Sequence, residues 1–167
     1  MSLFVSVIVP CFNEQNTITL LLDALLAQTH PRQQLEVVIA DGLSTDHTRQ
    51  RIQDFSHQHP ELDIKVVDNS RRGIPAGLNQ ALKAARGDII VRLDAHSVPN
   101  PDYVARCVSA LVNGDGDNVG GVWEIKARDK GWQARSIALA AAHRLGVGDA
   151  QYRFTDRAQS VDTVPFG

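Results

Sequence analysis

Short apolar runs rich in β-branched residues alternate along much of the chain with segments whose apolar residues recur at helical spacing. We expect strands at residues 4–9, 35–40, 64–67 and 89–93. The segments between them carry Leu, Ile, Phe or Ala at intervals of three and four residues, which is typical of amphipathic helices. Strands that alternate with helices predict an α/β fold with a mostly parallel sheet and helices on both faces.

Candidate capping residues indicate where three of these helices begin or end. We expect Ser44 or Thr45 to cap the second helix and Asn100 to cap the fourth. Pro75 suits the first turn of the third helix, and Gly87 is placed to end it. Each strand would then lead through a short polar loop into a helix.

The regular alternation weakens after residue 113. A turn at 114–117 is followed by a candidate strand at 121–126, an alanine-rich candidate helix at 132–145 and a polar, loop-like stretch at 146–162. We expect Trp123 and Trp132 to lie in the core or to line a groove. The chain is therefore divided into an α/β part, residues 1–113, and an incomplete second region, residues 114–167.

Composition and charge exclude several classes of protein. The chain has 167 residues, of which 43% are hydrophobic, and a formal net charge of -2, which gives no global attraction for nucleic acid. Cys11 and Cys107 lack the paired spacing of zinc ligands, so we expect buried, reduced thiols. Neither a secretory leader nor an apolar run of roughly 20 residues is present. We therefore expect a soluble, cytoplasmic protein.

The residues that directly follow the expected strands are the candidates for chemistry, because ligands of parallel sheets bind at the carboxyl ends of the strands. Asp41 ends the second strand, where an aspartate can bind a ligand or simply form a turn. Asp94 and His96 follow the fourth strand and, one residue apart in an extended segment, can reach one cation. An aspartate with an imidazole suits Mn²⁺, Zn²⁺ or Fe²⁺ better than Mg²⁺. A turn-forming aspartate and a half-exposed histidine are the ordinary alternative.

Two adjacent arginines follow the third strand. Arg71 and Arg72, with Gly73, can hold phosphate groups or can be a solvated surface. The sequence contains neither a GxGxxG segment after the first strand nor a GxxxxGK[ST] segment, which argues against a dinucleotide dehydrogenase and a P-loop NTPase.

Three segments together identify a family. VSVIVPCFNEQNTI, LEVVIADGLSTDHT and GLNQALKAARGDIIVRLDAHSVPNPDYV resemble, in this order and spacing, the family 2 glycosyltransferases. The resemblance spans residues 5–103 and continues weakly to residue 167. It implies a GT-A fold, the Rossmann-like fold of nucleotide-diphospho-sugar transferases, truncated here at the C-terminus. The DAH triplet is similar to that of bacterial exopolysaccharide glucosyltransferases of the succinoglycan type.

The resemblance also implies roles for the residues at the strand ends. Residues 10–14, among them Pro10, Asn13 and Glu14, would line the nucleotide pocket together with Asp41, which would bond a uracil ring. Arg72, which follows the third strand, is added to the expected donor site from its position and charge, not from the resemblance.

The resemblance implies a cation site as well. Asp94 would bind the donor and a divalent cation, Mn²⁺ or Mg²⁺. His96 stands where the second acid of the family's DxD motif usually lies, so the identity of the metal is left open.

The activity implied is that of an inverting glycosyltransferase, which moves a sugar from a nucleoside diphosphate sugar to a saccharide or lipid-linked acceptor in cell-surface polysaccharide synthesis. We expect a uridine diphosphate donor. Residues 1–113 would bind this donor, and residues 114–167 would begin the acceptor side. The reaction needs a carboxylate that accepts the acceptor's proton. In relatives that base follows a segment similar to VDTVPFG, with which this sequence ends, so no catalytic residue is assigned.

Two alternatives stay open from the sequence. One is a non-catalytic fragment that binds a nucleotide-sugar, and the other is a flavodoxin-like or receiver-like signalling domain. The second lacks a paired acidic cluster after the first strand and a lysine after the last. A homodimer is compatible with either. Any membrane association, at the inner face, is expected to come only from segments beyond residue 167.

Overall fold

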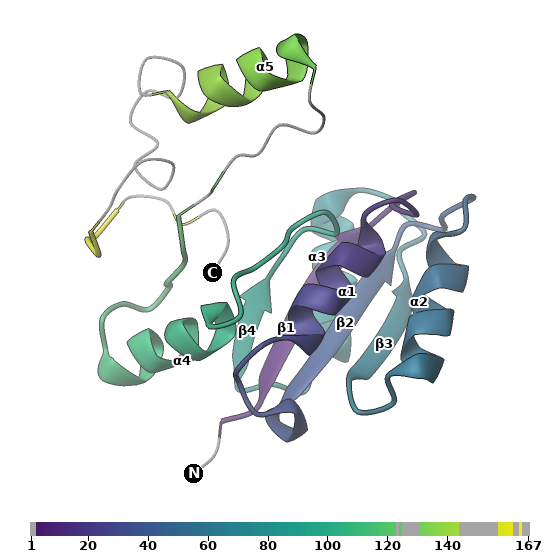
Figure 1. The fold of residues 1–167 in the computed structure, drawn as a ribbon. Coiled ribbons are helices and arrows are strands. Elements are labelled where there is room, and N and C mark those ends of the chain that lie inside the picture. The colour runs from purple at the N-terminus through teal and green to yellow at the C-terminus, as the bar shows by residue number, and fades with distance from the viewer. Residues whose placement is uncertain (1–2, 123, 125–130, 144–156, 162–163, 165–167) are drawn as a thin grey trace.

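Four parallel strands form the centre of the molecule. A computed structural model of the chain describes residues 3–122, 124, 131–143, 157–161 and 164. Within this part the sheet has the strand order β3-β2-β1-β4 (Figure 1). Parallel pairing brings the carboxyl ends of all four strands to one edge. The strands are β1 (Val5–Cys11), β2 (Leu35–Asp41), β3 (Asp63–Asp68) and β4 (Ile89–Arg92).

Helices cover both faces of this sheet, which confirms the architecture expected from the sequence. One face packs against α1, α2 and α4, and the other packs against α3 (Figure 1). The helices are α1 (Ile18–Leu26), α2 (Thr48–Gln58), α3 (Ile74–Ala84), α4 (Tyr103–Asn113) and α5 (Trp132–Ala142), with a short 3-10 turn, η1, at Arg32–Gln34.

The two central strands are buried on both faces. In β1, Val7 contributes to the larger core beneath α1, α2 and α4, while its neighbour Ile8 contributes to the smaller core beneath α3. In β2, Val37 and Val38 divide between the two cores in the same way. Because both faces of these strands are covered, their side chains are almost all apolar, and polar groups that meet solvent are found at the strand ends.

Small residues let α3 approach the sheet closely. A Cβ atom added at Gly77 would lie 3.5 Å from the Cβ of Pro10, 3.6 Å from that of Ala40 and 3.0 Å from Nδ2 of Asn69. A larger residue at position 77 would therefore push α3 away from the sheet. Pro75 lies in the first turn of this helix, as the sequence predicts.

A buried carboxylate joins three segments at the amino-terminal edge of the sheet. Glu36 is 1% exposed and accepts hydrogen bonds from the Ser6 hydroxyl (2.5 Å), the Arg86 backbone N–H (2.6 Å) and Arg86 Nε (2.9 Å). Gly87 follows in the same turn, and a Cβ there would lie only 2.5 Å from the Ser6 backbone nitrogen. The expectation that Gly87 ends the helix is wrong, because α3 ends at Ala84 and Gly87 is required by this close approach.

The predicted cap of α2 is also wrong. The helix begins at Thr48 rather than directly after Ser44 or Thr45. Ser44 instead donates its hydroxyl to Asp41, and the Asp46 carboxylate accepts the Thr48 backbone N–H at 3.0 Å. A local loop therefore replaces the first turn that the sequence suggested.

The fourth helix is capped by a side chain from a distant segment. The helix begins at Tyr103 and not at Pro101, so the expectation that Asn100 caps it is wrong. Gln28 is 6% exposed, accepts the Val104 N–H at 3.0 Å and donates Nε2 to the Asn100 carbonyl at 2.8 Å. The loop between β4 and α4 is thereby tied to the end of α1.

The region beyond α4 is described only in part. The helix expected at 132–145 is present as α5, and α4 ends at Asn113, while the division of the chain into two regions at that point stays a prediction. Trp132 is 76% exposed, which excludes the core for it and leaves groove lining as the open alternative, and Trp123 lies outside the described residues. The candidate strand at 121–126 also falls mostly outside them. None of the described helices is long and apolar enough to cross a membrane.

We predict that Glu36→Gln lowers the free energy of unfolding at pH 7 by about 1–3 kcal/mol, because a buried charge-assisted network loses its acceptor. Burial raises the pKa of Glu36, but the hydrogen bonds from Ser6 and Arg86 and the Arg86 charge together bring it below its ordinary value of 4.5. The stabilisation is therefore complete above that value and is lost as the pH falls through the lower folded-state pKa. Urea unfolding between pH 3 and pH 7 measures the effect. If the free energies of unfolding of the wild type and of Glu36→Gln change with pH in the same way, Glu36 is not the titrating group.

Candidate functional site

The loops that follow the four strands meet at the carboxyl edge of the sheet. The register pairs Cys11 with Asp41 and Asp41 with Asp68, so the ends of β1, β2 and β3 lie at the same level. Most of the site residues expected from the sequence lie at this edge.

Asp41 is the last residue of β2 and is fully buried. Its carboxylate accepts the Ser44 backbone N–H at 3.0 Å and the Ser44 hydroxyl at 2.5 Å. Arg49 Nε donates to the same carboxylate at 2.5 Å. Both carboxylate oxygens are therefore engaged by neighbouring residues. A direct bond from Asp41 to a ligand requires the exchange of one of these partners.

Arg49 joins the ends of two strands and was not found by sequence reasoning. Its guanidinium group pairs with Asp41 through Nε and with Asp68 through Nη2, each at 2.5 Å. The hydrogen bonds that Arg49 donates to these two carboxylates, first that to Asp68, hold the pKa of Arg49 above its ordinary value. No sequence signal marks Arg49, because its partners are 8 and 19 residues away and meet only in the folded sheet.

Hydrogen bonds join the loop after β1 to the loop after β2. Asn13 has a left-handed backbone (φ 53°), which lets its N–H donate to the Ser44 hydroxyl at 2.8 Å while its side-chain oxygen accepts the Thr45 N–H at 2.9 Å. The Glu14 N–H donates to the Thr48 hydroxyl at 2.8 Å. Asn13 and Glu14 thus lie at the expected edge and hold these two loops together.

Glu14 also reaches the loop after β4. Its Oε1 lies 3.3 Å from Nδ1 of His96, whose side chain is 62% exposed. Pro10, by contrast, is one residue short of the strand end and packs against α3 at Gly77. The fold therefore brings Glu14 and His96 together and leaves Pro10 beneath the site.

Asp94 carries the clearest sign of an open ligand position. Its Oδ1 is buried and accepts no hydrogen bond from the described residues, and Arg92 Nη2 lies 3.6 Å from it. Within the described part of the chain no three His, Cys, Asp or Glu side chains are grouped to hold a metal by themselves. An available carboxylate oxygen with a nearby imidazole fits a divalent cation that takes its remaining ligands from phosphate and water. Asp94 and His96 therefore fit a cation that binds together with a diphosphate.

Phe12 and Arg72 form a further part of this edge. Phe12 is 42% exposed, and the Arg72 guanidinium carbon lies 5.8 Å from its ring centroid. Gly42 lies against the ring, since a Cβ there would be 3.1 Å from Phe12 Cδ2. Arg72 itself has a left-handed backbone (φ 59°). Phe12 falls within residues 10–14, which the family resemblance places in the nucleotide pocket, but sequence reasoning gave its ring no separate role.

Cys11 lies at the floor of the site and is chemically inert there. Both cysteines are buried free thiols, as expected. Burial, and then the negative charges of Asp41, Glu14 and Asp46, raise the pKa of Cys11 to about 12. The thiol is therefore neutral at physiological pH and is neither a nucleophile nor a metal ligand in this state.

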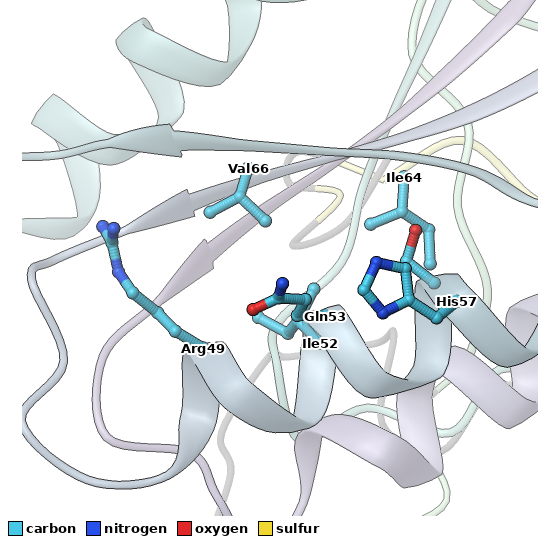
Figure 2. Close-up of a pocket in the computed structure, with 7 residues that line it drawn as sticks. Arg49, Ile52, Gln53, His57, Ile64 and Val66 are labelled. Atoms are coloured by element: carbon cyan, nitrogen blue, oxygen red, sulfur yellow. The ribbon is translucent and has the colours of Figure 1, made fainter.

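A separate cavity of about 320 Å³ lies between α2 and β3, and Figure 2 shows its lining side chains. It is lined by Arg49, Ile52, Gln53, Ser56, His57, Ile64 and Val66. Of these only Arg49 also contacts Asp41 at the carboxyl edge. The cavity lacks the carboxylates and loop residues described above, so we do not assign the chemistry to it.

Comparison with known proteins adds to this geometry. A family model described as Glycosyl transferase family 2 matches residues 6–164. The chain is 30% identical over 151 residues to the succinoglycan biosynthesis protein ExoA of Rhizobium meliloti, covering 88% of this chain and 44% of that protein. The chain spans less than half the length of the curated relatives it matches.

Two solved structures are similar in fold and sequence. One is the mannosyltransferase PcManGT from Pyrobaculum calidifontis in complex with GDP-Man and Mn²⁺, with 34% identity and a TM-score of 0.66 over 85% of this chain and 41% of that chain. The other is S. aureus TarS 1-349 in complex with UDP, with 28% identity and a TM-score of 0.63 over 75% of this chain and 40% of that chain.

We predict that both thiols resist Ellman's reagent in the native protein at pH 8 and react fully in guanidinium chloride. Raising the pKa of Cys11 from 9.0 to about 12 leaves roughly a thousandfold less thiolate, and burial blocks the reagent as well. Absorbance at 412 nm follows the reaction. A Cys107→Ser variant isolates Cys11, and prompt labelling of that variant would show that solvent reaches the floor of the site.

Proposed function

The chain belongs to glycosyl transferase family 2, and from this premise we propose that its carboxyl edge binds a nucleoside diphosphate sugar for transfer to a saccharide or lipid-linked acceptor in cell-surface polysaccharide synthesis. The parallel sheet and the similarity to TarS and PcManGT confirm the expected GT-A fold. The family match also excludes the flavodoxin-like and receiver-like alternatives. The observation that carries the proposal is Asp94, whose buried Oδ1 at the end of β4 accepts no hydrogen bond from the described residues.

The nucleotide is proposed to bind where the loops after β1, β2 and β3 meet. The exposed ring of Phe12 offers a stacking surface for a base, and Arg72 lies over the same ring. Asp41 lies at the adjoining strand end, where one of its oxygens can exchange the Ser44 hydroxyl for a base N–H. We propose uridine as the nucleoside, supported by the UDP in the TarS structure, although PcManGT was solved with GDP-Man.

The diphosphate is proposed to lie beside Asp94 and His96. These two residues would hold a divalent cation, for which we propose Mn²⁺, supported by the Mn²⁺ in the PcManGT structure and by the imidazole in the ligand set. Such an ion, when bound, neutralises charge that develops on a departing diphosphate. Asp94 supplies the fixed negative charge, and Glu14 holds the imidazole of His96 at the edge of the sheet.

Of the described carboxylates of this edge, Asp41 and Asp94 are thus assigned to the donor, and we assign no catalytic base. An inverting transfer needs a carboxylate that accepts the acceptor's proton, which is typically worth 10²–10⁴-fold in rate. The alternative form of the proposal is a chain that binds the donor and transfers its sugar only slowly. A cytoplasmic location, and one at the inner face of the membrane in a longer protein, stay predictions.

Asp94→Asn should abolish the effect of Mn²⁺ on nucleotide binding, because the neutral amide is a much weaker cation ligand. Calorimetry with UDP and GDP, each with and without Mn²⁺, is the measurement. Asp88→Asn is the matched control, because Asp88 accepts the Phe4 N–H at the opposite edge of the sheet. If neither nucleotide binds the wild-type protein, the proposed function is wrong. Equal cation effects in the two variants would remove Asp94 from the site.

Asp41→Ala should weaken UDP binding by about 1–3 kcal/mol, because a donor on the base loses its acceptor. The same change also releases Ser44 and Arg49, so a loss of stability is expected with it. Arg49→Met removes the ion pair but leaves the carboxylate in place. If the two variants lose the same UDP affinity, Asp41 acts by positioning the loop and does not contact the base.

A further inference from the structure

Arg92 is the last residue of β4 and lies beside the carboxylate proposed to hold the cation. Its Nη2 is 3.6 Å from Oδ1 of Asp94, and the two side chains are 35% and 25% exposed. Arg92 pairs in register with Ile8, a residue of the smaller core beneath α3. Residues 92 and 94 are two apart, so an extended backbone directs both side chains to that same face. The strand geometry therefore places the side chains of Arg92 and Asp94 next to each other.

The charges at the expected cation site differ from those of a site built from two neighbouring acidic residues. Asp94 contributes one negative charge, Arg92 contributes one positive charge, and His96 can ligate a metal only as a neutral imidazole. The charge of Arg92 thus opposes that of Asp94, which weakens the attraction of the Asp94 carboxylate for a free divalent cation. The Glu14 carboxylate beside His96 carries the remaining negative charge. His96 is also engaged, since its Nδ1 lies 3.3 Å from Glu14 Oε1. Both expected ligands therefore have a protein partner in the absence of a donor.

A nucleoside diphosphate changes this balance, because it brings phosphate oxygens that a guanidinium group binds well. We propose that Arg92 makes divalent-cation binding conditional on the donor. It pairs with Asp94 before the donor binds and turns to the diphosphate afterwards, which frees Asp94 as a ligand. This inference rests on the proposed donor site. It assigns Arg92 two partners, a carboxylate in the free protein and a phosphate in the complex.

The proposal implies coupling between two ligands. If the diphosphate releases Asp94, UDP must raise the affinity for Mn²⁺, and Mn²⁺ must raise the affinity for UDP by the same factor. Removal of Arg92 should strengthen the binding of Mn²⁺ alone and weaken the binding of UDP alone. A purely structural role for Arg92 would not produce these opposite changes.

The test is calorimetric titration of the full chain with Mn²⁺, in the absence and presence of saturating UDP, with GDP in parallel. Arg92→Met should bind Mn²⁺ alone about tenfold more tightly than the wild type, because a positive charge close to the ligating oxygen is gone. Its gain in Mn²⁺ affinity on adding UDP should shrink by a similar factor. Arg92→Lys keeps the charge and should stay near the wild type in the binding of Mn²⁺ alone.

Arg106→Met is the matched control, since it removes the same charge from a pair with Asp102 at 3.7 Å whose side chains are 79% and 54% exposed. It should leave Mn²⁺ binding unchanged. Equal affinity of Arg92→Met and Arg106→Met for Mn²⁺ alone overturns the proposal. Circular dichroism melting checks that each variant folds, and Arg92→Gln, which also removes the charge, replaces the methionine variant if that one does not.

The two proposals fail in different ways. The binding of Mn²⁺ alone tests the pairing of Arg92 with Asp94 without any nucleotide. If no nucleotide binds the wild-type protein, the proposed function and the diphosphate half of the inference are both overturned. If UDP binds and promotes Mn²⁺ binding equally in the wild type and in Arg92→Met, only the inference is overturned.

Discussion

The parallel pairing of β1 with β2 on one side and β4 on the other is the constraint on which the rest of the structure depends. It buries the central strands on both faces, so their interiors are apolar and carry no chemistry. It also brings every strand end to one edge, where the following loops must satisfy one another's polar groups. A site at this edge is a consequence of that geometry, as in other open parallel sheets.

The two edges of the sheet use buried carboxylates for different purposes. At the amino-terminal edge, Glu36 is enclosed by Ser6 and Arg86 and joins three segments of chain. At the carboxyl edge, Asp41 is equally buried, but its partner Ser44 belongs to a loop that also contacts the loop after β1, and its partner Arg49 belongs to α2. The first network stabilises the fold, and the second also sets the shape of the proposed donor site.

Arginine side chains already pair with three carboxylates of the proposed donor site. Arg49 bridges Asp41 and Asp68, while Arg92 lies beside Asp94. A ligand that binds these carboxylates must therefore replace interactions that already exist. This exchange favours a ligand that carries both an anionic group for the arginines and a cation for the carboxylate, as a nucleoside diphosphate with a divalent ion does.

The sequence by itself determined the order of strands and helices and the positions of the polar residues that follow them, because both depend on local periodicity and on short motifs. It therefore led to Asp41, Asp94 and His96. Only the tertiary structure decided which of these groups have partners, since Arg49 reaches Asp41 across the end of the sheet and Glu14 meets His96 82 residues along the chain. The start of α4 at Tyr103 was likewise decided by the distant Gln28, which leaves no local pattern in the sequence, whereas the start of α2 at Thr48 depends on Asp46, two residues before it.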